Sequence, residues 1–418
     1  MAAALGLGLA GNASAATWCG TPGSTDRLPQ VAAGYSVHVV YAIPSDGVDR
    51  LAEWASRMQT DAETIDAWWR REDPTRAPRF DTYPFPCASQ LDITLLRLSS
   101  SDGDTEPIDI RADRILAGLS STGLSSSPYQ KLVVYYDGAD RQGSQKICGQ
   151  GGRNFAFVYV NACTDVPTDD VVAHELIHAL GAVPGAAPHQ CPRPNSGHTC
   201  DTAADIMYWQ ADGQNLFAHL LDPGRDDYYG HSGAWFDVQD SPWLTHLDAQ
   251  AQLSLTFAGQ GTVTSDIPGV QCSAACTSQW DAGTQVTLKA APATGQRFVS
   301  WNGGCTGAAA CVVKVGEVGA VGAVFGPAVF GIKVSLRGKG RVRSTPSALN
   351  CPARCAVQVA AGISAVLSAQ PAKGWRFSRW YGACRGTAAR CLVPMKGDRS
   401  ARAVFVRVTK TAKTILRS

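Results

Sequence analysis

Residues 170–189, DVVAHELIHALGAVPGAAPH, carry the pattern on which the interpretation of this chain depends. His174 and His178 are four residues apart, so a helix would project both imidazoles from one face towards a single metal ion. Glu175 lies beside them and is placed to take a proton from a water molecule on that ion. Gly181 suits the left-handed conformation in which many helices end. The stretch therefore predicts a helix that carries two metal ligands and a general base.

The third ligand is less well defined by the sequence. A catalytic zinc ion usually takes three protein ligands and leaves one position for water. A downstream glutamate is excluded, because none occurs between Glu175 and Glu317. The residues alone leave His189 and His198 as candidates. The further candidates that the sequence leaves open are His219, His231, His246, Asp201 and Asp205.

On these residues the chain resembles the metzincin peptidases, in which His-Glu-x-x-His-x-x-Gly-x-x-His is followed by a turn that carries methionine. His174, Glu175, His178 and Gly181 match the first part of this pattern, and Met207 in DIMY matches the Met-turn. The resemblance, to secreted actinobacterial enzymes in particular, covers about residues 35–245.

The chain departs from the metzincin pattern at Pro184, which occupies the position of the third histidine and cannot bind zinc. We expect the longer loop after Gly181 to bring His189 to the metal instead, as the third ligand, with His198 as the alternative. The resemblance implies an α+β fold with a mixed sheet, an active-site helix and a Met-turn. It further implies Zn²⁺ as the cofactor, a protein or peptide substrate, endopeptidase activity with Glu175 as the general base, and Met207 as the apolar floor of the site.

Hydrophobic patterning supports a sheet domain over residues 16–248. Alternation and apolar runs predict strands, and one long amphipathic segment predicts a helix. Strands that alternate with helices indicate an α/β or α+β domain. The expected strands are 35–44, 91–99, 131–138 and 154–163, and the expected helix is 48–73.

The C-terminal third is an internal repeat, which divides into modules at 253–326 and 331–406. GQGTVTSDIPGVQCSAAC, from residue 259, aligns with GKGRVRSTPSALNCPARC, from residue 338, at an offset of 79. Both modules continue with F-x2-W-x-G-x-C and end with A-V-F, and their short alternating segments predict β-strands. On these motifs they resemble the divergent internalin-type B-repeat, or bacterial repeat domain, which implies a surface or secreted context and possible binding.

The 14 cysteines are even in number, six before residue 201 and four in each repeat. In an exported chain such usage predicts disulfides; zinc binding by the four cysteines of each repeat is the alternative. Proximity in the sequence suggests the pairs Cys191–Cys200 and Cys148–Cys163, which leaves Cys19 to pair with Cys87. A free Cys19 acting as a zinc ligand in a latent form is the alternative to that last pair.

Charge divides the chain into two parts. From residue 331 onwards there are 18 basic residues and one acidic residue, and the first part is correspondingly acidic. Residues 1–15 have the apolar run and small-x-small pattern of a signal peptide, so we expect a secreted, extracellular protein without a membrane span. The basic second repeat and the basic tail, 407–418, could bind an anionic cell-surface polymer. A catalytically inactive adhesion protein that acts through its repeats is therefore the alternative function.

Overall fold

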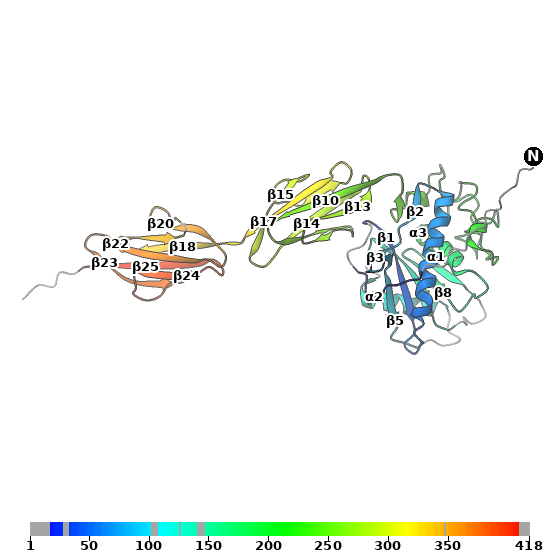
Figure 1. Ribbon diagram of the computed structural model, residues 1–418, viewed down its shortest axis with the longest axis horizontal. Helices are drawn as coiled ribbons and strands as arrows, with labels where there is room; N and C mark the ends of the chain where they lie inside the picture. Colours follow the sequence, from blue (N-terminus) through cyan, green and yellow to red (C-terminus); the bar gives the residue numbers. More distant parts are fainter. Residues whose placement is uncertain are drawn as a thin grey trace, which may run out of the picture.

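The computed structural model describes residues 17–27, 33–101, 108–124, 127–139, 147–346 and 348–408. Figure 1 shows an α/β unit followed by two β-rich units in a row, with the second repeat at the end far from the α/β unit. The expected signal peptide at 1–15 and the tail from residue 409 lie outside the described residues. In the described part of the chain, no helix combines the length and the apolar character needed to cross a bilayer.

The α/β unit is built on a five-stranded sheet of order β5-β1-β6-β8-β7. The first four strands are parallel, and β7 pairs antiparallel with β8 at the edge. The central strands β1 (Ser36–Ile43) and β6 (Gln130–Tyr136) are buried at every position. Burial on both faces explains why most of their residues are apolar, without hydrophobic alternation. The sheet is mixed, as expected.

Alternate residues of β1 separate two hydrophobic layers. Val39 and Tyr41 belong to the core that contains α1 and α3, whereas Val40 and Ala42 belong to the core that contains α2. Because successive side chains of a strand point to opposite faces, α1 and α3 cover one face of the sheet and α2 covers the other. This packing places α3 directly beside the edge of the sheet formed by β8 and β7.

The elements of the α/β unit, in chain order, are β1 (Ser36–Ile43), α1 (Leu51–Glu72), β2 (Arg76–Pro78), β3 (Thr82–Pro84), β4 (Ser89–Leu91), β5 (Ile93–Arg97), α2 (Ile108–Thr122), β6 (Gln130–Tyr136), β7 (Gly149–Gly152), β8 (Phe155–Tyr159), α3 (Thr168–Leu180), the 3-10 turns η2 (Leu216–Ala218) and η3 (Val238–Asp240), and β9 (Leu244–His246). The expected strand 91–99 is divided into β4 and β5 at Asp92, whose carboxylate binds Arg27. The sequence pattern did not reveal α2 or β7.

Each repeat is a sandwich of two four-stranded sheets. In the first repeat the orders are β13-β10-β17-β15 and β12-β11-β14-β16, and in the second they are β21-β18-β25-β23 and β20-β19-β22-β24. Both repeats contain one parallel pair, β10 with β17 and β18 with β25. Both also carry a bulge at the same place, after Phe298 and after Phe377. Corresponding strands of the two modules therefore pair in the same register, so each strand position in one module has a counterpart in the other.

The strands of the first repeat are β10 (Gln250–Ala258), β11 (Gly261–Ser265), β12 (Gln271–Cys272), β13 (Cys276–Asp281), β14 (Gln285–Pro292), β15 (Gln296–Gly303), β16 (Cys311–Lys314) and β17 (Ala320–Pro327). Those of the second are β18 (Val329–Arg337), β19 (Gly340–Thr345), β20 (Asn350–Cys351), β21 (Ala356–Ala360), β22 (Ser364–Pro371), β23 (Trp375–Gly382), β24 (Arg390–Pro394) and β25 (Arg399–Arg407).

All the cysteines form disulfides, and the expected pairs Cys19–Cys87, Cys148–Cys163 and Cys191–Cys200 are confirmed. Cys19 is therefore not free to bind a metal. Each repeat holds two short-range disulfides, so their cysteines are not arranged as zinc sites. Such disulfide density is typical of proteins that function outside the reducing cytosol.

The first repeat is fixed to the α/β unit around Asp281, at the end of β13. Its carboxylate binds Arg79 at 2.5 Å and accepts a hydrogen bond from Thr245 Oγ1 at 2.9 Å. Burial alone would raise the pKa of Asp281, but Arg79 and these hydrogen bonds lower it below its ordinary value. The junction is therefore a buried ionic contact.

Candidate metal centre

Helix α3 supplies the two histidines that the sequence predicts. Its face towards the sheet is apolar, with Val172, Leu176 and Ile177 buried in the core. The helix ends at Gly181, whose φ is 124° and whose N–H bonds to the carbonyl groups of Ile177 and His178. Burial of the apolar face fixes the rotation of the helix and directs the histidine pair towards the cleft beside β7.

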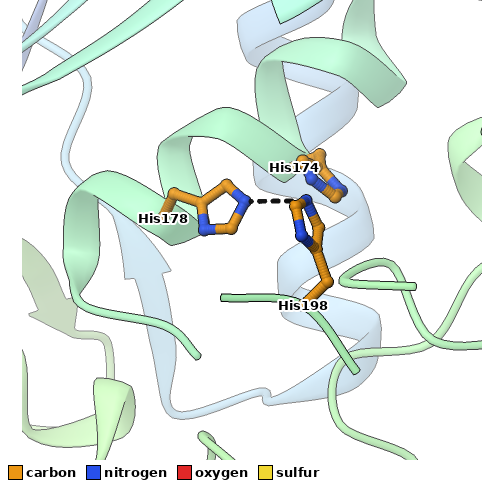
Figure 2. A group of neighbouring side chains, drawn as sticks. All are labelled: His174, His178 and His198. Carbon is orange, nitrogen blue, oxygen red and sulfur yellow. Dashed lines mark hydrogen bonds between the residues drawn. The ribbon is translucent and has the colours of Figure 1, made fainter. Parts of the chain in front are cut away.

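His174 and His178 converge with His198, which comes from the loop after α3 (Figure 2). The ring centroids are 4.9 Å apart for His174 and His178, 5.2 Å for His174 and His198, and 4.8 Å for His178 and His198. The potential ligand atoms of the three residues all lie within 4.8 Å of one another. Nε2 of His178 is 3.3 Å from Nε2 of His198.

Each of the three imidazoles binds a backbone carbonyl group through Nδ1. His174 Nδ1 lies 2.7 Å from the oxygen of Ile206, His178 Nδ1 lies 3.0 Å from that of Ala182, and His198 Nδ1 lies 3.1 Å from that of Asn195. A carbonyl oxygen only accepts hydrogen bonds, so each Nδ1 must carry the proton. Each neutral ring then has a lone pair on Nε2, the arrangement that second-shell carbonyl groups impose on metal-binding histidines.

The surroundings also keep the rings neutral. Burial lowers the pKa of His174 well below its ordinary value, and the neighbouring histidines add to this effect. Burial likewise lowers the pKa of His178, to about 4, and lowers that of His198. Two lone pairs that face each other at 3.3 Å repel unless a cation lies between them. The three residues are therefore neutral nitrogen donors suited to a shared positive charge.

The geometry fits a tetrahedral zinc ion. Two nitrogens bound to one zinc at about 2.0–2.1 Å are about 3.3–3.4 Å apart at the tetrahedral angle. The observed separation of 3.3 Å between Nε2 of His178 and Nε2 of His198 matches that distance. Three histidine ligands would leave the fourth position for water or substrate, as in catalytic zinc sites.

His189, the third ligand expected from the sequence, is not brought to this group, and His198 stands in its place. The backbone N–H and Nδ1 of His189 both face the buried carboxylate of Asp227, at 2.8 and 3.1 Å. Its side chain is 42% exposed. The loop after α3 runs past His189 and returns to His174 and His178 only at His198.

Backbone contacts determine where this loop returns. The N–H of Val183 bonds to the oxygen of Gly197 at 3.2 Å, and the N–H of Cys191 bonds to the oxygen of His198 at 2.8 Å. The disulfide Cys191–Cys200 closes the same pair of segments. These contacts fix the backbone on both sides of His198 without involving its side chain.

The segment that contains Met207 packs next to the backbone that carries His198. Met207 is completely buried in the core, and its carbonyl oxygen accepts the N–H of Thr199, next to His198. The buried carboxylate of Asp205 accepts hydrogen bonds from the N–H of Met207 and from Tyr228 Oη, at 2.8 and 2.7 Å. Asp205 thus organises the turn and is not one of the three grouped ligands.

Glu175 is buried between α3 and the edge strand β7. Its carboxylate accepts a hydrogen bond from the backbone of Gly151, but burial is the larger effect and raises its pKa to about 8. A Cβ atom added at Gly149 would lie 2.5 Å from Glu175 Oε1, and one added at Gly151 would lie 2.3 Å from the Cβ of His178. The two glycines therefore permit the close approach of β7 to Glu175 and to His178.

A cleft of about 540 Å³ runs over these residues. It is lined by β7, α3, the loop with His198 and the segment 203–211. His219, one of the candidate ligands, lines the cleft but binds Asp170 and Asp212 through its two nitrogens, at 2.8 and 3.4 Å. The hydrogen bond to Asp170 is the main cause that raises the pKa of His219. Both ring nitrogens of His219 therefore face carboxylates and not the group of three histidines.

Of the remaining candidates, Asp201 lies with His189 and Asp227, His231 packs on Trp235, and His246 belongs to β9. Sequence reasoning missed β7 and the three carbonyl groups that orient the imidazoles. Every residue has a backbone carbonyl group, so the sequence does not indicate which of them will accept a hydrogen bond from a histidine. The alternate glycines of GQGG, just after Cys148, were the only local signal for β7.

Comparison with known proteins identifies the C-terminal modules. Residues 252–323 and 345–409 match the family model of the divergent InlB B-repeat domain, which confirms the resemblance of the repeats. That match covers about a third of the chain and excludes the α/β unit. No curated protein is significantly similar to the chain.

Solved structures show only distant likeness. The Bacillus anthracis TIE protein aligns with a TM-score of 0.25 and 6% identity, over 40% of this chain and 35% of that one. Catalytically inactive OgpA from Akkermansia muciniphila, in complex with an O-glycopeptide substrate, aligns with a TM-score of 0.30 and 11% identity, over 83% and 92%. The major pilin T-13 of Streptococcus pyogenes gives a TM-score of 0.17 and 9% identity, over 38% and 97%. At such scores these likenesses carry no argument about function.

Proposed function

We propose that the α/β unit is a secreted zinc-dependent endopeptidase in which His174, His178 and His198 hold the metal and Glu175 is the general base. One observation carries this proposal. All three imidazoles commit Nδ1 to a backbone carbonyl group and turn an unprotonated Nε2 towards a common point. A purely structural histidine cluster has no need for three rings in the same tautomer, whereas a zinc site does.

When bound, zinc would act as a Lewis acid on the scissile carbonyl and lower the pKa of a nearby water. Glu175 accepts the proton of the attacking water and later delivers it to the leaving amine. Its buried position raises the pKa of Glu175 to about 8 in the metal-free site. The protonated form is correspondingly easy to reach, as the second transfer requires.

The cleft favours an extended peptide as the substrate. β7 is the edge strand of the sheet and lines the cleft along one side. A sheet edge offers backbone donors and acceptors that an extended chain can pair with. The likeness of the stretch around His174 to the metzincin pattern supports the same reaction.

The test is hydrolysis of an unfolded protein by the purified full chain. We expect activity that is lost with a chelator and restored by added zinc. Glu175→Gln should abolish hydrolysis but retain the metal, because Glu175 is not a ligand. His189→Asn serves as the matched control, since His189 lies away from the three grouped histidines. Full activity of Glu175→Gln, or no zinc-dependent hydrolysis by the unaltered chain, would refute the proposal.

A further inference from the structure

We propose that one face of the second repeat, the outer face of the sheet β21-β18-β25-β23, binds an extended anionic glycopolymer of the cell surface. The inference does not depend on catalysis in the α/β unit. It rests on the charge of this face, on an aromatic ring beside a hollow in it, and on the absence of the ring and of four of the five cations from the same face of the first repeat.

Basic side chains are concentrated in the second repeat. Residues 331–406 contain 14 basic residues and one acidic residue, whereas residues 253–326 contain three of each. The single acid, Asp398, accepts the N–H of Gly331 at 2.7 Å. The fold is the same in both modules, so the fold does not require this charge.

Strand register places five of these basic residues on one face. On β18 and β25 the buried residues Val334, Ala401 and Ala403 face the core, so the residues that alternate with them face outwards. On β23 the residues paired with outward positions of β25 also face outwards. The basic residues of this face, which we call the basic sheet face, are Lys333, Arg337, Arg376, Arg379 and Arg402, and all are exposed.

The centre of the basic sheet face is hollowed and carries a tyrosine. A shallow hollow of about 530 Å³ is lined by Lys333, Arg337, Arg402 and Tyr381, among others. Tyr381 is 50% exposed, pairs with Arg402 across the strands and has the guanidinium group of Arg379 5.6 Å from its ring centre. An exposed aromatic ring flanked by two guanidinium groups suits a sugar ring next to a negative charge, because the ring packs on the sugar while arginine binds the anion.

The first repeat provides an internal comparison. The matching register places Ser254 where the second repeat has Lys333, and Ala258 where it has Arg337. Gly322, Ser300 and Asn302 correspond to Arg402, Arg379 and Tyr381. Of the five basic positions, only that of Arg376 is also basic in the first repeat, as Arg297. Four cations and the tyrosine therefore occur on this face in one module alone, and three of those cations line the hollow with Tyr381. This module lies at the end of the chain away from the α/β unit (Figure 1).

Other anionic partners fit this face less well. A membrane surface calls for exposed apolar side chains that insert, but the outward residues between the cations, Val404 and Val406, are half-buried. Duplex DNA bound by charge would not need the tyrosine, and the disulfides are typical of a module outside the reducing cytosol, where nucleic acid of either kind is not the usual partner. An extracellular polymer of charged sugars accounts for both the cations and Tyr381.

The experiment measures binding of the full chain to polygalacturonate, an anionic polysaccharide, as a function of salt. The test variant is Lys333→Ser with Arg337→Ala, and each new residue is the one that the first repeat carries there. The control variant is Arg341→Thr with Arg343→Thr, on β19 of the opposite sheet, where the first repeat has Thr262 and Thr264. Both variants remove the same charge from strands that tolerate the new residues.

We expect the affinity to fall with salt, to fall by about tenfold in the test variant and to change little in the control variant. Tyr381→Asn, also the residue of the first repeat, should weaken binding to polygalacturonate but not to polyglutamate, which has no sugar. A chelator should leave binding unchanged, which separates this inference from the proposed catalysis.

Three results would overturn the proposal. One is equal loss of affinity in the two charge variants, which would show binding by net charge alone. Another is no binding to polygalacturonate at low salt. The third is tighter binding to duplex DNA or to phosphatidylglycerol vesicles than to the polysaccharide.

Discussion

The contact between β7 and α3 gives the sharpest test of how the site is positioned. An alanine Cβ at position 151 would lie 2.3 Å from the Cβ of His178 and 3.0 Å from Glu175 Oε2. Carbon atoms pack at about 3.5–4.0 Å, so the strand and the helix would have to separate by about 1.2–1.7 Å. Gly151→Ala should therefore lower the free energy of unfolding by about 1–3 kcal/mol, as overpacking does.

The same displacement should act on catalysis. A shift of about 1 Å at a catalytic group can cost about a hundredfold in rate, so we expect kcat/KM to fall by about that factor. Peptide hydrolysis, zinc content and thermal unfolding are measured on one preparation, with Gly185→Ala as the control. A Cβ at Gly185 meets nothing within 4 Å, so that variant should behave like the unaltered chain. Unchanged stability and kcat/KM in Gly151→Ala would refute the reasoning.

Three further predictions concern the support of the site and of the junction. Asp205→Ala should lower the free energy of unfolding by about 3 kcal/mol in urea denaturation, because it leaves buried donors without an acceptor; a loss within error would contradict this. Replacing Cys191 and Cys200 by serine opens a loop with a sequence separation of 9, which should lower the free energy of unfolding by about 2.5 kcal/mol. The same variant should bind zinc more weakly in a competition titration, and an unchanged zinc affinity would argue against this role of the disulfide. The pKa of Asp281 is lowered in the folded chain, so the ionised carboxylate stabilises the fold above the unfolded pKa of about 3.9, and this stabilisation is lost as the pH falls. In thermal melts over a range of pH, the difference in Tm between the unaltered chain and Asp281→Asn should therefore shrink in acid. A difference in Tm that stays constant with pH would disprove this.

The sequence was sufficient for the parts of the site that depend on local geometry. Spacing of four residues is a property of the helix itself, so His174, Glu175 and His178 could be grouped from their spacing alone. The central strands could be recognised because burial on both faces requires a continuous apolar run. Two disulfide pairs of the α/β unit followed the proximity of the cysteines along the chain, and the third, Cys19–Cys87, was the pair that remained.

The third member of the histidine group could not be predicted in this way. Between Gly181 and His198 the path of the loop is determined by bonds to distant backbone groups and by the disulfide at Cys191. His189 was nearer in sequence, but its contact with Asp227 draws it to another part of the surface. β7 was missed for a related reason, since its glycines carry no hydrophobic alternation and their role is evident only when α3 is packed against them.

The basic sheet face of the second repeat shows what an internal repeat adds to a structure. The excess of cations could be counted from the sequence, but their distribution over two sheets could not. The strand register gives each outward position of the second repeat a counterpart in the first repeat. Where the counterpart is a different type of residue, the shared fold does not require the residue of the second repeat.

The central claim is that His198, with His174 and His178, binds zinc. Its most direct test is the zinc content of the full chain, measured by elemental analysis after dialysis against a weak chelator, beside His198→Ala and His189→Ala. The account predicts about one zinc ion per chain in the unaltered protein and in His189→Ala, and a large loss in His198→Ala. Zinc retained in His198→Ala but lost in His189→Ala, or no zinc in the unaltered chain, would contradict it.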